Sequence, residues 1–564
     1  MKFYRGTLAA WLVQLCIVFS AHAQQVPDQI YTNGKIITVD DYFSIQQAVA
    51  VKGERIIAVG NNDAITSLAD AQTQRIDLAG KTMIPGLIDN HNHVVRATEY
   101  WPNDPRLDGV TTRSKALKIL RNKSKTLPKG AWLMSLGGWQ ESQFIDSQAD
   151  FTLAELDSIA TDRPVILQSV YDHIYGNSAW FKAMGIPMSS SSTPIGKAQG
   201  LSQYVVWDDN GNATGRLNGG FPMISEAIKQ FPSVPSDEQE DAIKLAFKYY
   251  NELGLTSVYD PGGVGIKQES YARTKQLADS EGITLRVFHT LNAGVPNSPE
   301  AADLLIKRIH STKPFQGSAA FDLIAMGEIY YGPFHWDDEL DAKSPSTFEL
   351  SIGRKILEAA ASQAWPVQTH AMQPETIDVL FDVMTDINKE FPLRQLRWSI
   401  THADNIGASQ IQRARQLGVN LQMRSISVLG DRHQITEKFG DASLDMPPLR
   451  LIQDSGIPFG LGTDGTKANQ ISPFVTLWWA ITGQALNGDL VMRQTLSREE
   501  ALIAHTRSNA YLMFQEANLG SIRPGFMADM LVLDQDYLTI PEDQIKSIRP
   551  VATILGGRLV SGEL

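Results

Sequence analysis

Cysteine is almost absent from this 564-residue sequence: only Cys16 is present, and it lies within the first 23 residues. Those residues have a basic start, an apolar stretch from Leu8 to Phe19 and an Ala-His-Ala end, which together predict a signal peptide cleaved after Ala23. We therefore expect a periplasmic or secreted protein, with an uncleaved anchor as the alternative. The mature chain would hold no cysteine, which excludes disulfides and thiolate metal ligands.

Excess positive charge and long apolar runs are also missing. The net charge is -12, whereas binding to nucleic acid depends on clustered Lys and Arg. The apolar stretch near the start is shorter than the roughly 20 residues that span a bilayer, so we expect no stable membrane insertion after cleavage. The composition, with 43% hydrophobic residues, is that of a globular protein. A small-molecule substrate is expected, and a homo-oligomer is left open.

Short β-type runs occupy both ends of the mature chain, residues 24–81 and 521–564. Turn residues such as Asn33-Gly34 separate the runs, as in antiparallel sheets. We predict that the two segments fold together into a small β-sandwich domain. Two unrelated edge strands are the alternative.

Between these ends, over residues 82–520, β-type runs alternate with helical patterns such as those at 236–253 and 374–391, which predicts an α/β fold with a parallel sheet. The gap at about 95–235 is predicted to be an insertion after the first strand, with strands of its own. Eight barrel strands are expected, the number that closes a TIM-type (β/α)8 barrel. They are 82–89, 255–260, 283–289, 321–327, 366–370, 397–402, 419–423 and 458–464.

Metal-binding residue types stand where several of these strands end. His91 and His93 follow the first strand, and extended chain puts both rings on one face. His370, His402 and Asp464 end the fifth, sixth and eighth strands, at the face where barrel active sites lie. Nitrogen and oxygen ligands suit zinc, or another divalent ion such as manganese, iron or nickel. The alternative for any one of these histidines is a satisfied core residue.

Several short motifs are spread over nearly all of the mature chain. They are Pro85-Gly-Leu-Ile-Asp-Asn-His-Asn-His, Gly137-Gly-Trp-Gln-Glu, Asn177-Ser, Gly254-Leu-Thr-Ser-Val-Tyr-Asp, Thr369-His-Ala, Ile400-Thr-His, Gly462-Thr-Asp-Gly and Leu519-Gly-Ser-Ile-Arg-Pro-Gly. In these motifs the chain resembles the amidohydrolase superfamily, in particular the amidohydrolase 3 family. The resemblance implies a metal-dependent hydrolase with a (β/α)8 barrel and a terminal β-sandwich, and with metal ligands at His91, His93, His370, His402 and Asp464.

The fourth strand departs from the family pattern. Relatives with two metals commonly carry a carboxylated lysine there, but this chain has Asp322 at the lysine position. Glu328, just past the strand end, could bridge two ions instead. The alternative is a single metal on His91, His93, His370 and Asp464, with His402 orienting the water. Either carboxylate, Asp322 or Glu328, could equally be structural.

The expected activity is hydrolysis of a C–N bond in an amide, an N-acyl amine or a cyclic amide. Asp464 is predicted to act as general base and then general acid, and the resemblance places His173 as a hydrogen-bond donor to the oxyanion. Trp139, Tyr171, His173 and Arg424 are candidate substrate contacts, because they lie near strand ends or in the insertion. Ester or lactone hydrolysis, deamination and a degenerate non-catalytic binding protein are the alternatives.

Overall fold

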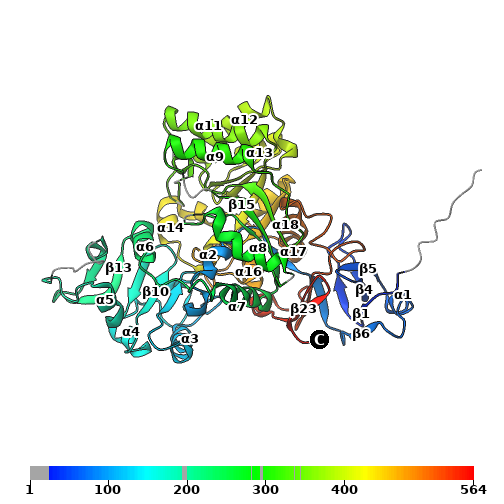
Figure 1. The fold of residues 1–564 in the computed structure, drawn as a ribbon, viewed down its shortest axis with the longest axis horizontal. Coiled ribbons are helices and arrows are strands. Elements are labelled where there is room, and N and C mark those ends of the chain that lie inside the picture. Colours follow the sequence, from blue (N-terminus) through cyan, green and yellow to red (C-terminus); the bar gives the residue numbers. More distant parts are fainter. Residues whose placement is uncertain are drawn as a thin grey trace, which may run out of the picture.

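Eight parallel strands form the centre of the computed structural model (Figure 1). They make two four-stranded sheets, in the orders β16-β15-β14-β8 and β17-β18-β19-β20. Isolated parallel bridges, Met326 with Val367 and Asn92 with Gly465, connect the sheets at both edges. The expected ring of eight strands is therefore present. The strands are β8 (Leu87–Asp89), β14 (Leu255–Asp260), β15 (Arg286–Leu291), β16 (Phe321–Met326), β17 (Gln368–Ala371), β18 (Ser399–His402), β19 (Asn420–Arg424) and β20 (Phe459–Gly462).

The structure describes residues 25–192, 200–263, 265–280, 282–292, 296–335, 337–338, 340–342 and 344–564. The predicted signal peptide and its cleavage site at Ala23 lie outside these residues. No helix within the described part of the chain is long and apolar enough to cross a membrane.

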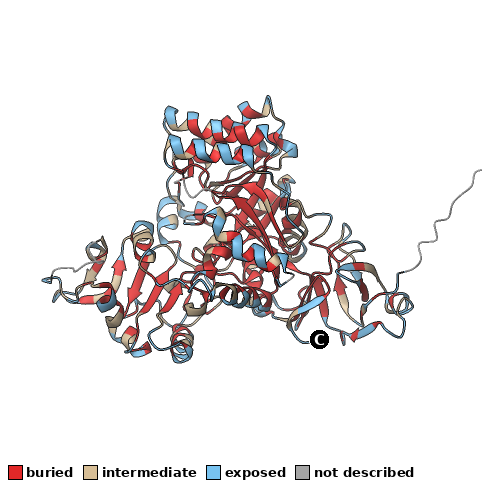
Figure 2. Ribbon diagram, viewed as in Figure 1, coloured by how far each residue is buried: buried red, intermediate tan, exposed pale blue. Residues whose placement is uncertain are grey.

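Helices follow the barrel strands and cover them on the outside. Both helices expected from the sequence are present, as α7 and α12, and Figure 1 shows α9, α11, α12 and α13 packed together at the top of the view. Figure 2 shows that their barrel-facing sides are buried and their outer sides exposed, as an apolar stripe at helical spacing requires. The longer helices are α7 (Gln239–Glu252), α8 (Ala272–Asp279), α9 (Pro299–Ser311), α11 (Thr347–Ser362), α12 (Pro374–Asn388), α13 (Ala408–Leu417) and α16 (Pro473–Thr482). The shorter ones are α2 (Val94–Thr98), α10 (Gly332–His335), α14 (His433–Phe439), α15 (Leu449–Ser455), α17 (Arg498–Ala504) and α18 (Arg507–Leu512).

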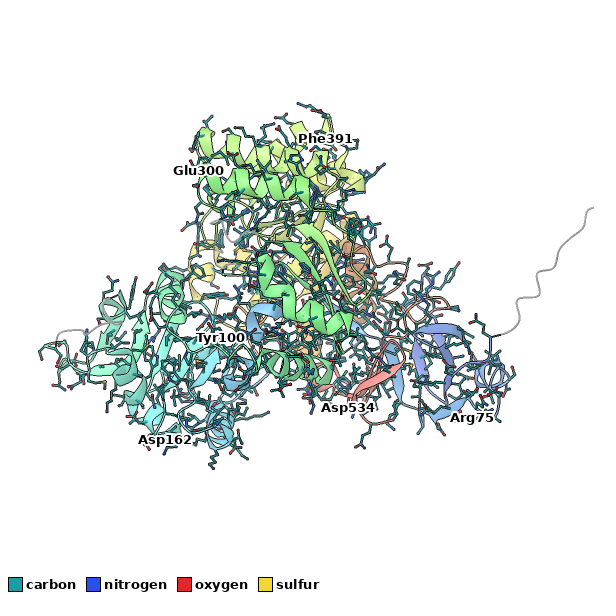
Figure 3. All side chains as sticks on the ribbon, viewed as in Figure 1. Arg75, Tyr100, Asp162, Glu300, Phe391 and Asp534 are labelled. Atoms are coloured by element: carbon teal, nitrogen blue, oxygen red, sulfur yellow. The ribbon has the colours of Figure 1, made fainter. Side chains whose placement is uncertain are left out.

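The insertion after β8 has a five-stranded sheet of its own, in the order β12-β13-β11-β10-β9. Two separate hydrophobic clusters pack against it. Tyr100, labelled in Figure 3, marks its junction with the barrel, because its ring belongs to one of these clusters while the Lys467 ammonium lies 5.5 Å from the ring centroid. The elements are β9 (Leu133–Leu136), β10 (Val165–Ser169), β11 (His173–Gly176), β12 (Val205–Trp207) and β13 (Ala213–Asn218), with α3 (Arg113–Thr126), α4 (Leu153–Ile159), α5 (Ser178–Met184) and α6 (Gly220–Ile228).

The two terminal segments fold together, as the sequence predicted. One sheet has the order β5-β4-β1-β6 and the other β23-β22-β21-β7-β2-β3, so strands from both ends of the chain share the second sheet. A single hydrophobic cluster contains residues of both. The elements are β1 (Gln29–Thr32), β2 (Lys35–Ile37), β3 (Ile45–Gln46), β4 (Ala48–Lys52), β5 (Arg55–Gly60), α1 (Asn62–Thr66), β6 (Gln74–Asp77), β7 (Thr82–Pro85), β21 (Met530–Leu533), β22 (Pro550–Leu555) and β23 (Arg558–Gly562).

Two details of these sheets were predicted wrongly. The terminal sheets are mixed instead of antiparallel, because β1 pairs with β6 and β2 with β7 in parallel. The strand expected over 82–89 is split at Gly86, where β7 leaves for the terminal sheet to pair with β21 and β8 enters the barrel. A Cβ at Gly86 would lie 2.2 Å from the Thr256 hydroxyl, so only glycine lets the chain pass β14 this closely.

Candidate metal centre

Six side chains from five barrel strands meet at the carboxyl ends of those strands. His91 and His93 follow β8, Glu328 follows β16, and Asp464 follows β20. His370 lies on β17, and His402 ends β18. All but His370 are less than 6% exposed. The barrel therefore brings together the five metal ligands that the resemblance implied, and Glu328 joins them.

Glu328 lies at the centre of the four imidazoles. Its Oε1 is 3.6 Å from His93 Nε2. Its Oε2 is 3.4 Å from His91 Nε2, 3.4 Å from His370 Nδ1 and 3.2 Å from His402 Nε2. One carboxylate thus faces both the histidine pair of β8 and the pair from β17 and β18.

Asp464 closes the cluster from the opposite side. Its Oδ1 lies 3.2 Å from His93 Nε2 and 3.7 Å from His91 Nε2. Its Oδ2 accepts a hydrogen bond of 2.7 Å from Arg424 Nη1, and the same guanidinium is bound to Asp404 at 2.6 Å. Arg424 therefore holds one oxygen of Asp464 and leaves the other turned toward the histidines.

Three groups of these side chains have the geometry to hold a metal ion. Several of the imidazole nitrogens, including both of His91, Nδ1 of His370 and Nδ1 of His402, are buried without a hydrogen-bond partner among the described residues. Such nitrogens are costly unless something binds them. A divalent ion would satisfy them, so the residues present fit a metal. The groups are His91, His402 and Asp464; His91, His93 and Glu328; and Glu328, His370 and His402.

The protonation states also suit metal binding. Burial lowers the pKa of His91 to about 3, so its ring is neutral at pH 7 and keeps a lone pair for a cation. Burial alone would raise the pKa of Glu328, but its close contacts with the imidazoles of His91, His370 and His402 outweigh burial and hold the pKa well below its usual range. The pKa of Asp464 is lowered in the same way, with His93 making the first contribution. The neutral ring of His91 therefore faces two ionised carboxylates, Glu328 and Asp464.

Hydrogen bonds donated to Asp89 fix the ends of the first and last barrel strands. Its carboxylate accepts from His91 N at 3.1 Å, Asn92 Nδ2 at 2.9 Å, Thr463 N at 3.0 Å and Thr463 Oγ1 at 2.6 Å. Burial raises the pKa of Asp89 to about 6 despite these bonds. Because Thr463 directly precedes Asp464, this network sets the spacing between the ligands of β8 and β20.

Asp322 does not join the cluster, although it occupies the lysine position of the family pattern. Its Oδ1 accepts a hydrogen bond of 2.7 Å from Gly317 N, and it belongs to none of the three groups formed by the described residues. The suggestion that Asp322 binds metal is therefore wrong, because its side chain leaves β16 away from the strand ends. Glu328 takes the central place.

A cavity of about 550 Å³ adjoins the cluster and reaches His370. Tyr171 and Arg424, both proposed as substrate contacts, line it together with apolar residues such as Met372 and Ile426. Burial raises the pKa of the Tyr171 phenol, and the charges of Asp464 and Glu328 raise it further. The phenol is therefore a hydrogen-bond donor at neutral pH.

Trp139 was predicted wrongly as a substrate contact. Its side chain is fully buried in the insertion, with its ring stacked 6.1 Å from Phe144 and edge-on to Phe151 at 5.8 Å. It fills a core.

The oxyanion role implied for His173 does not fit its contacts either. Nε2 lies 3.2 Å from Glu141 Oε1 and Nδ1 lies 2.8 Å from Asp172 Oδ2. Burial lowers the pKa of His173, but these two carboxylates more than reverse the effect and raise it to about 9. Both nitrogens of this imidazolium are already engaged, so neither is available to an oxyanion.

Three acidic residues with direct contacts to predicted site residues were missed. Asp404 binds Arg424, Asp337 lies against His370, and Glu141 binds His173. Asp404 comes two residues after the end of β18, so the strand-end rule could have found it. Asp337 lies in the loop after α10, and Glu141 begins a short 3-10 helix (Glu141–Gln143) at the end of the motif Gly137-Gly-Trp-Gln-Glu; neither follows a barrel strand, so their positions relative to the barrel strands do not identify them.

A parallel barrel with a histidine–carboxylate cluster at its strand ends defines a metal-dependent hydrolase. The chain belongs to the amidohydrolase family, whose amidohydrolase 3 model matches residues 74–561. An N-substituted formamide deformylase from Arthrobacter pascens is 25% identical, covering 95% of this chain and 98% of its own. The protein LONG AFTER FAR-RED 3 of Arabidopsis thaliana is 23% identical, covering 94% and 91%. A solved metal-dependent hydrolase from Pyrococcus horikoshii has the same fold, with a TM-score of 0.62 at 20% identity over 91% and 99% of the two chains.

Proposed function

We propose that this protein is an exported hydrolase that cleaves a C–N bond in an amide, N-acyl amine or cyclic amide and uses two divalent ions, with zinc favoured. The observation that carries the proposal is the position of Glu328. Its Oε1 faces His93, and its Oε2 faces His370 and His402 and also His91, at 3.2 to 3.6 Å. A carboxylate readily bridges two cations, so Glu328 can do what a carboxylated lysine does in relatives.

When bound, the divalent ions lower the pKa of a water molecule and polarise the substrate carbonyl. Asp464 contributes Oδ1, which faces the histidines and accepts the proton of the attacking water. The same oxygen then gives that proton to the leaving nitrogen. Arg424 keeps Asp464 ionised and prevents its rotation by holding Oδ2 at 2.7 Å. Arg424 thus serves the proton-transfer group.

The cavity favours a neutral substrate. The Arg424 charge is balanced by Asp404 and Asp464, so this arginine does not present an unbalanced cation to a substrate carboxylate. The Tyr171 hydroxyl donates a hydrogen bond to the substrate oxygen. This is the oxyanion-stabilising role that the resemblance implied for His173. Apolar residues such as Met372 and Ile426 receive the N-substituent. The likeness to an N-substituted formamide deformylase supports starting with N-substituted formamides.

The test is hydrolysis by zinc-loaded protein lacking residues 1–23. Matched formamides, acetamides, lactams, esters, lactones and aminopurines of similar size would be compared by the release of amine, alcohol or ammonia. We expect C–N cleavage of neutral amides, and loss of that activity with chelator and its return with zinc. If only esters or lactones were turned over, the protein would be an ester or lactone hydrolase. If only aminopurines were turned over, it would be a deaminase. No turnover by fully metal-loaded protein would favour a binding protein.

Export is tested separately by expressing the full chain and the same chain with Leu8 to Phe19 interrupted by two arginines. The intact chain should appear outside the cytoplasm with Gln24 as its first residue. Recovery of both chains in the cytoplasm with an intact N-terminus would contradict export.

A further inference from the structure

Asp337 is a buried carboxylate in the loop that follows α10, beside the metal centre. One of its oxygens has a clear structural task. Oδ2 accepts hydrogen bonds from Met372 N at 2.8 Å and from Gln373 N at 3.0 Å, at the start of α12. This pair of bonds fixes the carboxylate against the segment that follows β17.

The other oxygen faces His370. Oδ1 of Asp337 lies 3.6 Å from His370 Nε2 and has no hydrogen-bond partner among the described residues. The opposite nitrogen of the same ring, Nδ1, lies 3.4 Å from Glu328 Oε2 and is also unpartnered. The ring of His370 therefore stands between a buried carboxylate on one edge and the metal cluster on the other.

A third contact restrains the backbone of the same residue. His335 Nδ1 lies 3.0 Å from the carbonyl oxygen of His370, and only a protonated Nδ1 can donate to a carbonyl. With the backbone held by His335, rotation of the His370 ring is the remaining freedom, and Asp337 limits it.

We propose that Asp337 is a positioning residue that sets the tautomer and orientation of His370 for metal binding. A carboxylate next to Nε2 keeps the proton on that nitrogen, which leaves the lone pair on Nδ1 directed at the cluster. The inference rests on the proposed metal-dependent function. It adds that one of the ligands is oriented from outside the cluster by a loop residue that the family pattern did not indicate.

Asp337→Asn separates this role from the structural one. The amide oxygen of asparagine still accepts from Met372 N and Gln373 N, while the amide nitrogen now meets His370 Nε2 and disfavours a proton there. Asp338→Asn is the matched control, because it removes the same charge one residue away. Asp338 is exposed, and its Oδ1 accepts from Leu340 N and Asp341 N, which asparagine can also do.

Zinc affinity of the full mature chain would be measured by competition with a chelating dye. We expect Asp337→Asn to weaken one zinc site about 10- to 100-fold, the usual effect of removing an outer partner of a metal-bound histidine. Asp338→Asn should stay within about twofold of wild type. Equal affinities of Asp337→Asn and wild type would overturn the inference while leaving the proposed function standing. A wild type that binds no zinc would overturn both.

A double-mutant comparison identifies the route of the effect. If Asp337 acts through His370, Asp337→Asn weakens zinc binding in the wild type but adds nothing in His370→Ala. The same loss in both backgrounds would assign Asp337 to loop structure alone and contradict the inference. Should His370→Ala not fold, the visible spectrum of cobalt-loaded protein gives a second readout. It should change in Asp337→Asn and not in Asp338→Asn, and an unchanged spectrum in both would also contradict the inference.

Discussion

The barrel and the insertion each hold a buried histidine–carboxylate cluster, and the two clusters differ in how their imidazoles are satisfied. In the barrel, neither nitrogen of His91 has a hydrogen-bond partner within the part of the chain that the structure describes, and burial lowers its pKa to about 3. In the insertion, Glu141 and Asp172 engage both nitrogens of His173 and raise its pKa to about 9. The first ring is neutral and keeps a lone pair for a metal ion, whereas the second is a cation inside an ion-pair network.

This difference separates binding from structural histidines better than residue type does. Both clusters contain the same kinds of side chain, and the imidazoles of His91 and His173 are both buried. The barrel cluster contains residues from several strand ends, so its imidazoles contact side chains that are distant in the sequence. His173, in contrast, is bound by its own sequence neighbour Asp172. We therefore expect changes in the barrel cluster to affect metal content and changes in the insertion cluster to affect stability.

The largest expected effect comes from Glu328→Gln. Glutamine lacks the negative charge with which Glu328 faces four imidazoles. Bound metal should therefore fall by at least one equivalent, and turnover should fall to the level of the enzyme treated with chelator. The matched change in the insertion, Glu141→Gln, should keep the metal content of wild type. Elemental analysis of both variants checks the contrast, and equal metal loss in both would remove the distinction between the clusters.

Asp464→Asn should lower kcat by about 10²- to 10⁴-fold, the range for losing a general acid–base group. Asparagine keeps an oxygen near Arg424, so the unfolding transition should shift little. Circular dichroism during heating provides the folding control. Near-normal turnover by Asp464→Asn would show that another group carries out the proton transfer.

A smaller, pH-dependent effect is expected from His173→Gln. The folded pKa of about 9 lies above the ordinary value of 6.5, so the charged ring stabilises the fold fully below about pH 6.5, and this contribution is lost as the pH rises through 9. The melting temperature of the variant should be several degrees below wild type at about pH 6, and the gap should close by about pH 10. Metal content should not change. A gap independent of pH would contradict the charged state of His173.

Much of the barrel could be predicted from the sequence because apolar runs and strand ends are local features. The ends of β14, β16 and β18 to β20 lie within two residues of the predicted ranges. The candidate metal ligands at the ends of β16, β18 and β20 are therefore found close to their predicted positions. The split at Gly86 could not be predicted, since the apolar run of 83–88 continues through it. The partner of β7 is β21, more than four hundred residues away, and only the assembled sheets determine where the chain changes from one to the other.

The candidate site shows the same limit. His91, His93, His370, His402 and Asp464 were found because they stand at or just past the ends of four predicted strands, with His91 and His93 following the same one. The role of Glu328 depends on the direction in which its side chain points. The spacing of residues in the sequence could not decide whether Glu328 bridges two metal ions or is a structural residue. The contacts of Asp337 and Glu141 depend on how loops fold back over the barrel and insertion sheets. Sequence therefore gives the positions of the ligands, and the structure gives the groups that orient or neutralise them.

The number of divalent ions per chain tests the central claim, the sharing of Glu328, most directly. Mature wild-type protein would be loaded with zinc, freed of excess ion by gel filtration and analysed for zinc and protein together. We predict two equivalents in wild type and one or none in Glu328→Gln. A single equivalent in wild type, retained in Glu328→Gln, would show that Glu328 bridges nothing and would contradict the account.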